Sequence, residues 1–125
     1  MANILVVDDE DRMRKLIKKI LSKKHSVSGE AKNGKEALEK LEEIDPDVIT
    51  LDIQMPKVDG LEVLSTVKEE SDSIKVVIVS VVSPNDEEMD DLQKKADAHV
   101  VKPARKKELL DAIEGILIEK EEDQD

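Results

Sequence analysis

Short apolar runs, mostly of β-branched residues, constrain the fold of this 125-residue chain more than any other feature of its sequence. They lie at residues 4–7, 48–51, 76–79 and 100–101. Continuous runs of this length are typical of strands that are buried on both faces, as in a parallel sheet. Residues 25–31 form a weaker candidate, because apolar and polar residues alternate there as in an edge strand.

Segments with the period of an amphipathic helix separate these runs. Five segments carry apolar residues on one face: Met13, Leu16, Ile17, Ile20 and Leu21; Ala37, Leu38 and Leu41; Leu61, Leu64 and Val67; Met89 and Leu92; and Leu109, Leu110, Ile113 and Leu117. Helix-start signals precede three of them: Asn33 with Glu36, Asp59 with Glu62, and Ser83 before Pro84. The segment around Met89 is the most polar of the five.

Five strand–helix units in this order predict a flavodoxin-like, doubly wound α/β sandwich. We expect a five-stranded parallel sheet in the order 2-1-3-4-5 with five helices. Residues 1–125 are expected to form a single domain, because the sequence has no internal repeat or linker. Residues 119–125 are rich in acids and are expected to be a frayed acidic tail.

The composition excludes several classes of function. Cysteine is absent, which excludes disulfides and thiolate metal sites. The formal net charge is −11 and the chain has no Phe, Tyr or Trp, so it would repel a phosphate backbone and cannot stack aromatic rings on bases. We therefore expect no nucleic-acid partner. No apolar run is long enough for membrane insertion and the first ten residues do not resemble a secretory signal, which favours a cytoplasmic protein.

Reactive side chains follow four of the predicted strands. Asp8 and Asp9 follow the first, Asp52 the third, Ser80 the fourth and Lys102 the fifth. The carboxyl ends of parallel strands share one edge of the sheet, where ligands bind in folds of this class. Each residue taken alone has an ordinary structural explanation, such as a helix cap, a loop acid or a solvated lysine. Their joint placement predicts a functional site.

Clustered carboxylates repel one another unless a cation neutralises them. Oxygen ligands without His or Cys favour magnesium over zinc. A carboxylate beside magnesium can attack a phosphoryl donor, while a lysine pairs with the transferred group and a hydroxyl hydrogen-bonds to it.

The same residues carry a family resemblance. The stretch from Pro46 to Pro56, continued by Asp59 and Gly60, resembles the receiver domains of two-component response regulators, including the stand-alone kind of chemotaxis. The resemblance covers about residues 4–117. It implies a signalling protein rather than an enzyme, apart from catalysis of its own phosphorylation and dephosphorylation. Its partners would be a sensor histidine kinase and a downstream protein that binds the fourth helix, fifth strand and fifth helix.

The resemblance also assigns roles to individual residues. Asp52 would be the phosphoacceptor and, with Asp9, would bind Mg²⁺ through its side chain. Gln54 would bind the metal through its backbone carbonyl. Asp8 would bind it through a water molecule or would support the metal ligands without contacting the ion. Lys102 would pair with the phosphoryl group.

The switch residues are also implied by the resemblance. Ser80 would move towards the phosphoryl group on activation, and Pro103 would follow a cis peptide that aims Lys102 into the site. His99 stands where receiver domains usually have Phe or Tyr, so it either takes the switch role or is a packing residue of the strand. Val81 replaces a smaller residue and is expected to slow the access of small phosphodonors.

Three alternatives remain open to different degrees. A pseudo-receiver that binds partners without phosphorylation usually lacks the acid pair, the acceptor or the lysine, all of which are present. A flavin- or nucleotide-binding protein would need a loop rich in Gly, Ser or Thr where this chain has residues 8–11, all acidic. A phosphoaspartate hydrolase would need an acid at Gln54.

Overall fold

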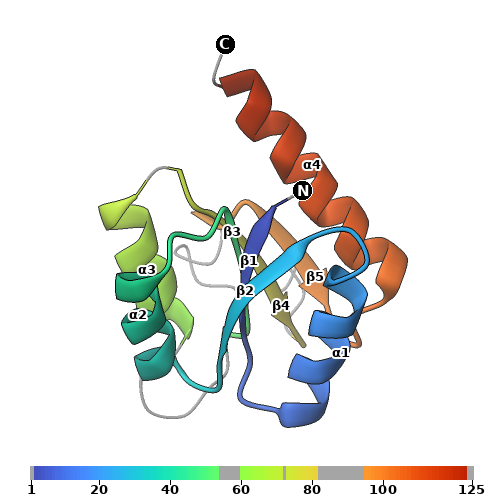
Figure 1. Ribbon diagram of the computed structural model, residues 1–125, viewed down its shortest axis with the longest axis horizontal. Helices are drawn as coiled ribbons and strands as arrows, with labels where there is room; N and C mark the ends of the chain where they lie inside the picture. The colour runs from blue at the N-terminus through green and yellow to red at the C-terminus, as the bar shows by residue number, and fades with distance from the viewer. Residues whose placement is uncertain (1, 54–59, 72, 82–94, 124–125) are drawn as a thin grey trace.

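The protein forms a five-stranded parallel sheet with helices on both of its faces (Figure 1). The computed structural model describes residues 2–53, 60–71, 73–81 and 95–123. Its strands are β1 (Asn3–Val7), β2 (Ser26–Ala31), β3 (Val48–Leu51), β4 (Lys75–Ser80) and β5 (Ala98–Val101). The helices of the described part are α1 (Asp11–Leu21), α2 (Gly34–Glu43), α3 (Gly60–Glu70) and α4 (Lys106–Asp123).

The strand order is β2-β1-β3-β4-β5, which confirms the predicted doubly wound topology. Helix α4 of the structure corresponds to the fifth helix that the sequence predicts. The predicted helix around Met89 and Leu92 lies outside the described residues, as do the start signals at Asp59 and at Ser83. None of the described helices combines the length and the apolar character that a membrane span needs.

The start of α2 shows how local chemistry fixes an element. The Asn33 side chain accepts a hydrogen bond from the backbone N–H of Glu36 at 2.8 Å. The Glu36 carboxylate in turn accepts one from the backbone N–H of Lys32 at 3.1 Å. These bonds satisfy donors that a helix start would otherwise leave without partners, so the predicted cap is confirmed.

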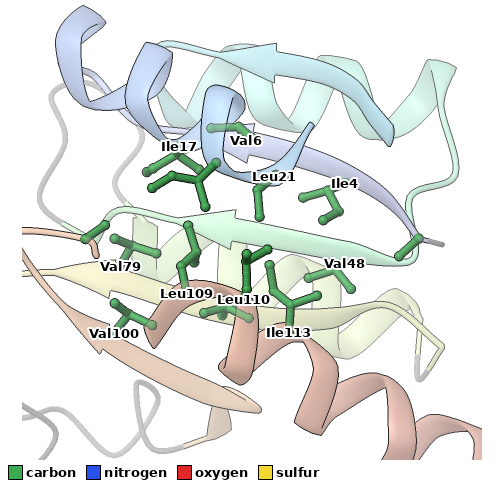
Figure 2. Packing of buried hydrophobic residues seen from close by; sticks show 14 of the residues in the cluster. Ile4, Val6, Ile17, Leu21, Val48, Val79, Val100, Leu109, Leu110 and Ile113 are labelled. Carbon is green, nitrogen blue, oxygen red and sulfur yellow. The ribbon is translucent and has the colours of Figure 1, made fainter. Parts of the chain in front are cut away.

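Two aliphatic layers make up the core, one on each face of the sheet. Helices α1 and α4 cover one face, and α2 and α3 cover the other (Figure 1). Figure 2 shows the first layer, in which Leu109 and Ile113 of α4 and Ile17 of α1 pack on strand residues such as Val6. In β1, Leu5 belongs to the other layer, because successive side chains of a strand point to opposite faces. Burial on both faces explains the continuous apolar runs.

The edge strand β2 contains an irregularity that its alternating sequence does not reveal. Ile4 of β1 pairs with Val27, but Leu5 pairs with Gly29, so the register shifts by one residue. As a result Val27 packs against the layer of α1 and α4, whereas Ala31 lies in the layer of α2 and α3.

The fold positions the functional residues by extending its backbone ladders past the strand ends. The N–H of Asp52 donates to the carbonyl of Val7 at 3.0 Å, and the N–H of Lys102 donates to the carbonyl of Ser80 at 2.8 Å. Asp52 and Lys102 are therefore held by the sheet and not by flexible loops.

Candidate functional site

Four residues predicted for the site meet at the carboxyl edge of the sheet. Asp8, Asp52 and Ser80 are buried there, and the Lys102 side chain is only 12% exposed. Asp9 is exposed to solvent. Strands β1, β3, β4 and β5 each contribute one of these positions, so the convergence expected from the sequence is present.

The acidic residues form one cluster. Asp8, Asp9 and Asp52 each offer a carboxylate oxygen, and these oxygens all lie within 4.8 Å of one another. Carboxylates this close repel one another strongly, above all where two of them are buried. A set of oxygen donors with one solvent-exposed member fits a small hard cation that keeps some of its water ligands. The cluster is therefore a candidate metal site.

Lys102 partly neutralises the cluster. Its Nζ atom lies 3.0 Å from Oδ2 of Asp8 and 3.4 Å from Oδ2 of Asp52. Burial of the ammonium group lowers the pKa of Lys102, but its hydrogen bond to Asp8 and the charge of Asp52 outweigh that effect and hold the pKa above its ordinary value. Lys102 therefore stays charged and points at the carboxylate proposed to react.

Contacts around Asp8 fix the turn between β1 and α1. The backbone N–H of Glu10 donates to Oδ1 of Asp8 at 2.8 Å. The guanidinium of Arg14 donates to the backbone carbonyl of Asp8, also at 2.8 Å, and to the carboxylate of Glu30 on β2 at 2.9 Å. Sequence reasoning missed Arg14, because nothing in its spacing separates it from the other basic residues of α1.

Gly60 is packed against the acceptor. A Cβ atom at this position would lie 2.3 Å from the carbonyl oxygen of Asp52 and 2.5 Å from Cα of Ile53. Both distances are far below van der Waals contact, so the start of α3 approaches the end of β3 as closely as it does only because residue 60 has no side chain. The Gly60 N–H also donates to the Ile53 carbonyl at 3.1 Å.

The remaining predicted residues are placed as follows. The peptide bond between Lys102 and Pro103 is cis, the isomer implied by the family resemblance. Val81, directly after buried Ser80, is 62% exposed. His99 is half-buried on β5 opposite Ile78, and Gln54 lies outside the described residues.

The fold is that of a response-regulator receiver. The family model of the response regulator receiver domain matches residues 4–114, so the chain belongs to that family. The chemotaxis protein CheY of Listeria monocytogenes is 39% identical over 115 residues, which are 91% of this chain and 97% of that protein.

Solved structures agree with this assignment. The CheX–CheY–BeF3–Mg complex of Borrelia burgdorferi matches with a TM-score of 0.83 and 29% identity, covering 92% of this chain and 88% of that one. The response regulator TrrA of Thermotoga maritima in complex with Mg–BeF matches with a TM-score of 0.81 and 33% identity, covering 92% and 98%.

Proposed function

We propose that this protein is a phospho-accepting response regulator that receives its phosphoryl group from a sensor histidine kinase. A carboxylate oxygen of Asp52 forms the new P–O bond, and the P–N bond of the kinase phosphohistidine breaks with its electron pair left on the imidazole. The observation that carries the proposal is the position of the Lys102 ammonium, 3.4 Å from Asp52 beside a cluster of three carboxylates.

Mg²⁺ is proposed as the cation of the acidic cluster. Asp9 and Asp52 would hold it through their carboxylates, Asp8 through a water molecule and Gln54 through its backbone carbonyl. When bound, Mg²⁺ would neutralise charge on the phosphoryl oxygens. The presence of magnesium with beryllium fluoride in two similar solved structures supports this choice. Lys102 would donate to a phosphoryl oxygen at the same time.

The signal is proposed to leave by protein–protein contact in the cytoplasm. Ser80 would move towards the phosphoryl group, and the change would reach the surface of β5, α4 and the predicted helix between them. The similarity to a chemotaxis protein over 91% of the chain supports a role in chemotaxis. Phosphorylation-dependent partner binding that persists in His99→Ala would assign His99 to packing alone.

Transfer from a kinase tests the proposal. Histidine kinases loaded with a labelled phosphoryl group are mixed with the wild-type protein, with Asp52→Asn and with Asp45→Asn, a control at an exposed aspartate of the loop before β3. Label is expected on the wild type and Asp45→Asn but not on Asp52→Asn. Label on Asp52→Asn would contradict the proposal and show that another residue is the acceptor. Label on none of the three proteins would contradict it and favour a pseudo-receiver.

A further inference from the structure

Arg14 joins three parts of the chain next to the acidic cluster. It donates to the backbone carbonyl of Asp8 at 2.8 Å, to Glu30 at 2.9 Å, and to Asp11 in the first turn of α1. Its own side chain is only 12% exposed, and its hydrogen bonds to Asp8 and Glu30 are partly buried, whereas the one to Asp11 is exposed. The guanidinium therefore ties the end of β1 and the start of α1 to β2.

The bond to Asp8 matters because of the peptide plane to which its carbonyl belongs. That plane links Asp8 to Asp9, so fixing its oxygen fixes the positions of the Asp9 N and Cα atoms, from which the Asp9 side chain leaves the backbone. The hydrogen bond from Glu10 to Oδ1 of Asp8 fixes the same turn from the other side. Among the described residues, no side-chain contact holds the exposed carboxylate of Asp9 in place.

Lys18 provides an internal comparison. It forms an ion pair with Glu30, as Arg14 does, but makes no described contact with Asp8. The hydrogen bonds from Lys18 and from Arg14 lower the pKa of Glu30, which therefore stays charged near neutral pH. Two cations thus share one carboxylate, and only one of them reaches the turn that carries the acid pair.

We propose that Arg14 is a positioning residue of the metal site, which orients Asp9 through the carbonyl of Asp8 and is itself oriented by Glu30. The inference rests on the proposed function, since it concerns the residues that would hold Mg²⁺. Outer contacts of this kind, when removed, typically weaken metal affinity about 10-fold to 100-fold.

The direction of the change in Mg²⁺ affinity distinguishes a positioning role of Arg14 from the effect of its positive charge. Removing a cation beside an acidic site favours the binding of a dication, so on electrostatic grounds alone both Arg14→Gln and Lys18→Gln would bind Mg²⁺ more tightly. A weaker affinity in Arg14→Gln can only come from lost geometry.

The experiment measures Mg²⁺ affinity in the unphosphorylated full chain, by calorimetry or by the shifts of backbone amides in NMR spectra. Arg14→Gln is expected to weaken the affinity by about 10-fold, whereas Lys18→Gln does not weaken it. Without metal, the amide hydrogen of Glu10 is expected to exchange faster in Arg14→Gln than in the wild type or in Lys18→Gln, because the turn is looser.

An affinity in Arg14→Gln equal to or tighter than that of the wild type would overturn the inference. If that variant does not fold, Arg14→Lys decides: it keeps the charge, but a single ammonium cannot replace the forked contacts to Asp8 and Glu30. Weaker binding in Arg14→Lys supports positioning, and wild-type affinity overturns it. Failure of the wild type itself to bind Mg²⁺ would contradict both the proposed function and the inference. An unweakened affinity in Arg14→Gln, with normal binding by the wild type, would overturn the inference alone.

Discussion

The ammonium group of Lys102 lies 3.0 Å from the carboxylate of Asp8, although the strands that precede them, β5 and β1, are separated in the sheet by β3 and β4. The long lysine side chain spans the ends of two intervening strands to reach the acid. The contact therefore joins the carboxyl ends of β1 and β5 electrostatically across the two strands between them.

Lys102→Met should lower the free energy of unfolding in the absence of metal. The substitution leaves two buried carboxylates without their cation. Loss of one partner of a buried ion pair lowers the free energy of unfolding by up to about 5 kcal/mol. Mg²⁺ should restore part of the loss, because it neutralises the same carboxylates. Urea unfolding followed by circular dichroism, with and without Mg²⁺, measures both effects. A loss of stability that is the same in both conditions would contradict the idea that Lys102 and the cation neutralise the same carboxylates.

Gly60→Ala should destabilise the protein, while Gly115→Ala should stabilise it. The added methyl group at residue 60 collides with the backbone of Asp52 and Ile53, and overpacking of this kind costs about 1–3 kcal/mol. Residue 115 lies inside α4 with open space around it, where alanine is about 0.5–1 kcal/mol better than glycine. Thermal unfolding of the two variants tests the pair. Equal melting temperatures would contradict the close packing at the acceptor.

Stability should fall as the pH is lowered below about 6.5, and His25 should be a cause. Burial lowers the pKa of His25 from its ordinary value of 6.5, and its Nδ1 atom accepts a hydrogen bond from the N–H of Ala2 at 3.1 Å. Between the folded-state pKa and 6.5 the unfolded chain binds the proton more readily, so the stabilisation is complete above this window and is lost below it. The free energy of unfolding, measured with urea at a series of pH values, should change less steeply with pH in His25→Gln than in the wild type. An unchanged slope in that variant would exclude His25 as the cause.

Val81→Ala should speed phosphorylation by a small donor such as acetyl phosphate. A smaller side chain after Ser80 widens the expected path to Asp52. A tenfold increase in the rate of phosphorylation would correspond to an activation free energy lower by about 1.4 kcal/mol. Val101→Ala is the control, because Val101 is an exposed valine paired with Ser80 in the neighbouring strand. Rates of phosphoryl uptake that are equal in Val81→Ala and in the wild type would remove the idea that this side chain limits access.

Much of the architecture was predictable because burial dictates the sequence pattern. The apolar runs at β1, β3 and β4 are continuous because helices cover both faces, and the carboxyl ends of parallel strands must share an edge. Asp8, Asp52 and Lys102 were therefore predictable as neighbours from the sequence.

Other features depend on contacts that no local pattern encodes. Arg14 looks like any solvent-facing base of an amphipathic helix until the fold brings Glu30 and the Asp8 carbonyl to it. The requirement for glycine at residue 60 arises from the approach of α3 to the end of β3. The register shift in β2 depends on pairing with β1, which the edge-strand pattern does not specify.

The most direct test of the account is the intact mass of the protein after incubation with acetyl phosphate, with and without Mg²⁺. We expect the wild type to gain one phosphoryl group only when Mg²⁺ is present, and Asp52→Asn to gain none. A gain that persists in Asp52→Asn would show that another residue is the acceptor. Failure of the wild type to gain the group from either acetyl phosphate or a histidine kinase would contradict the central claim that Asp52 accepts a phosphoryl group.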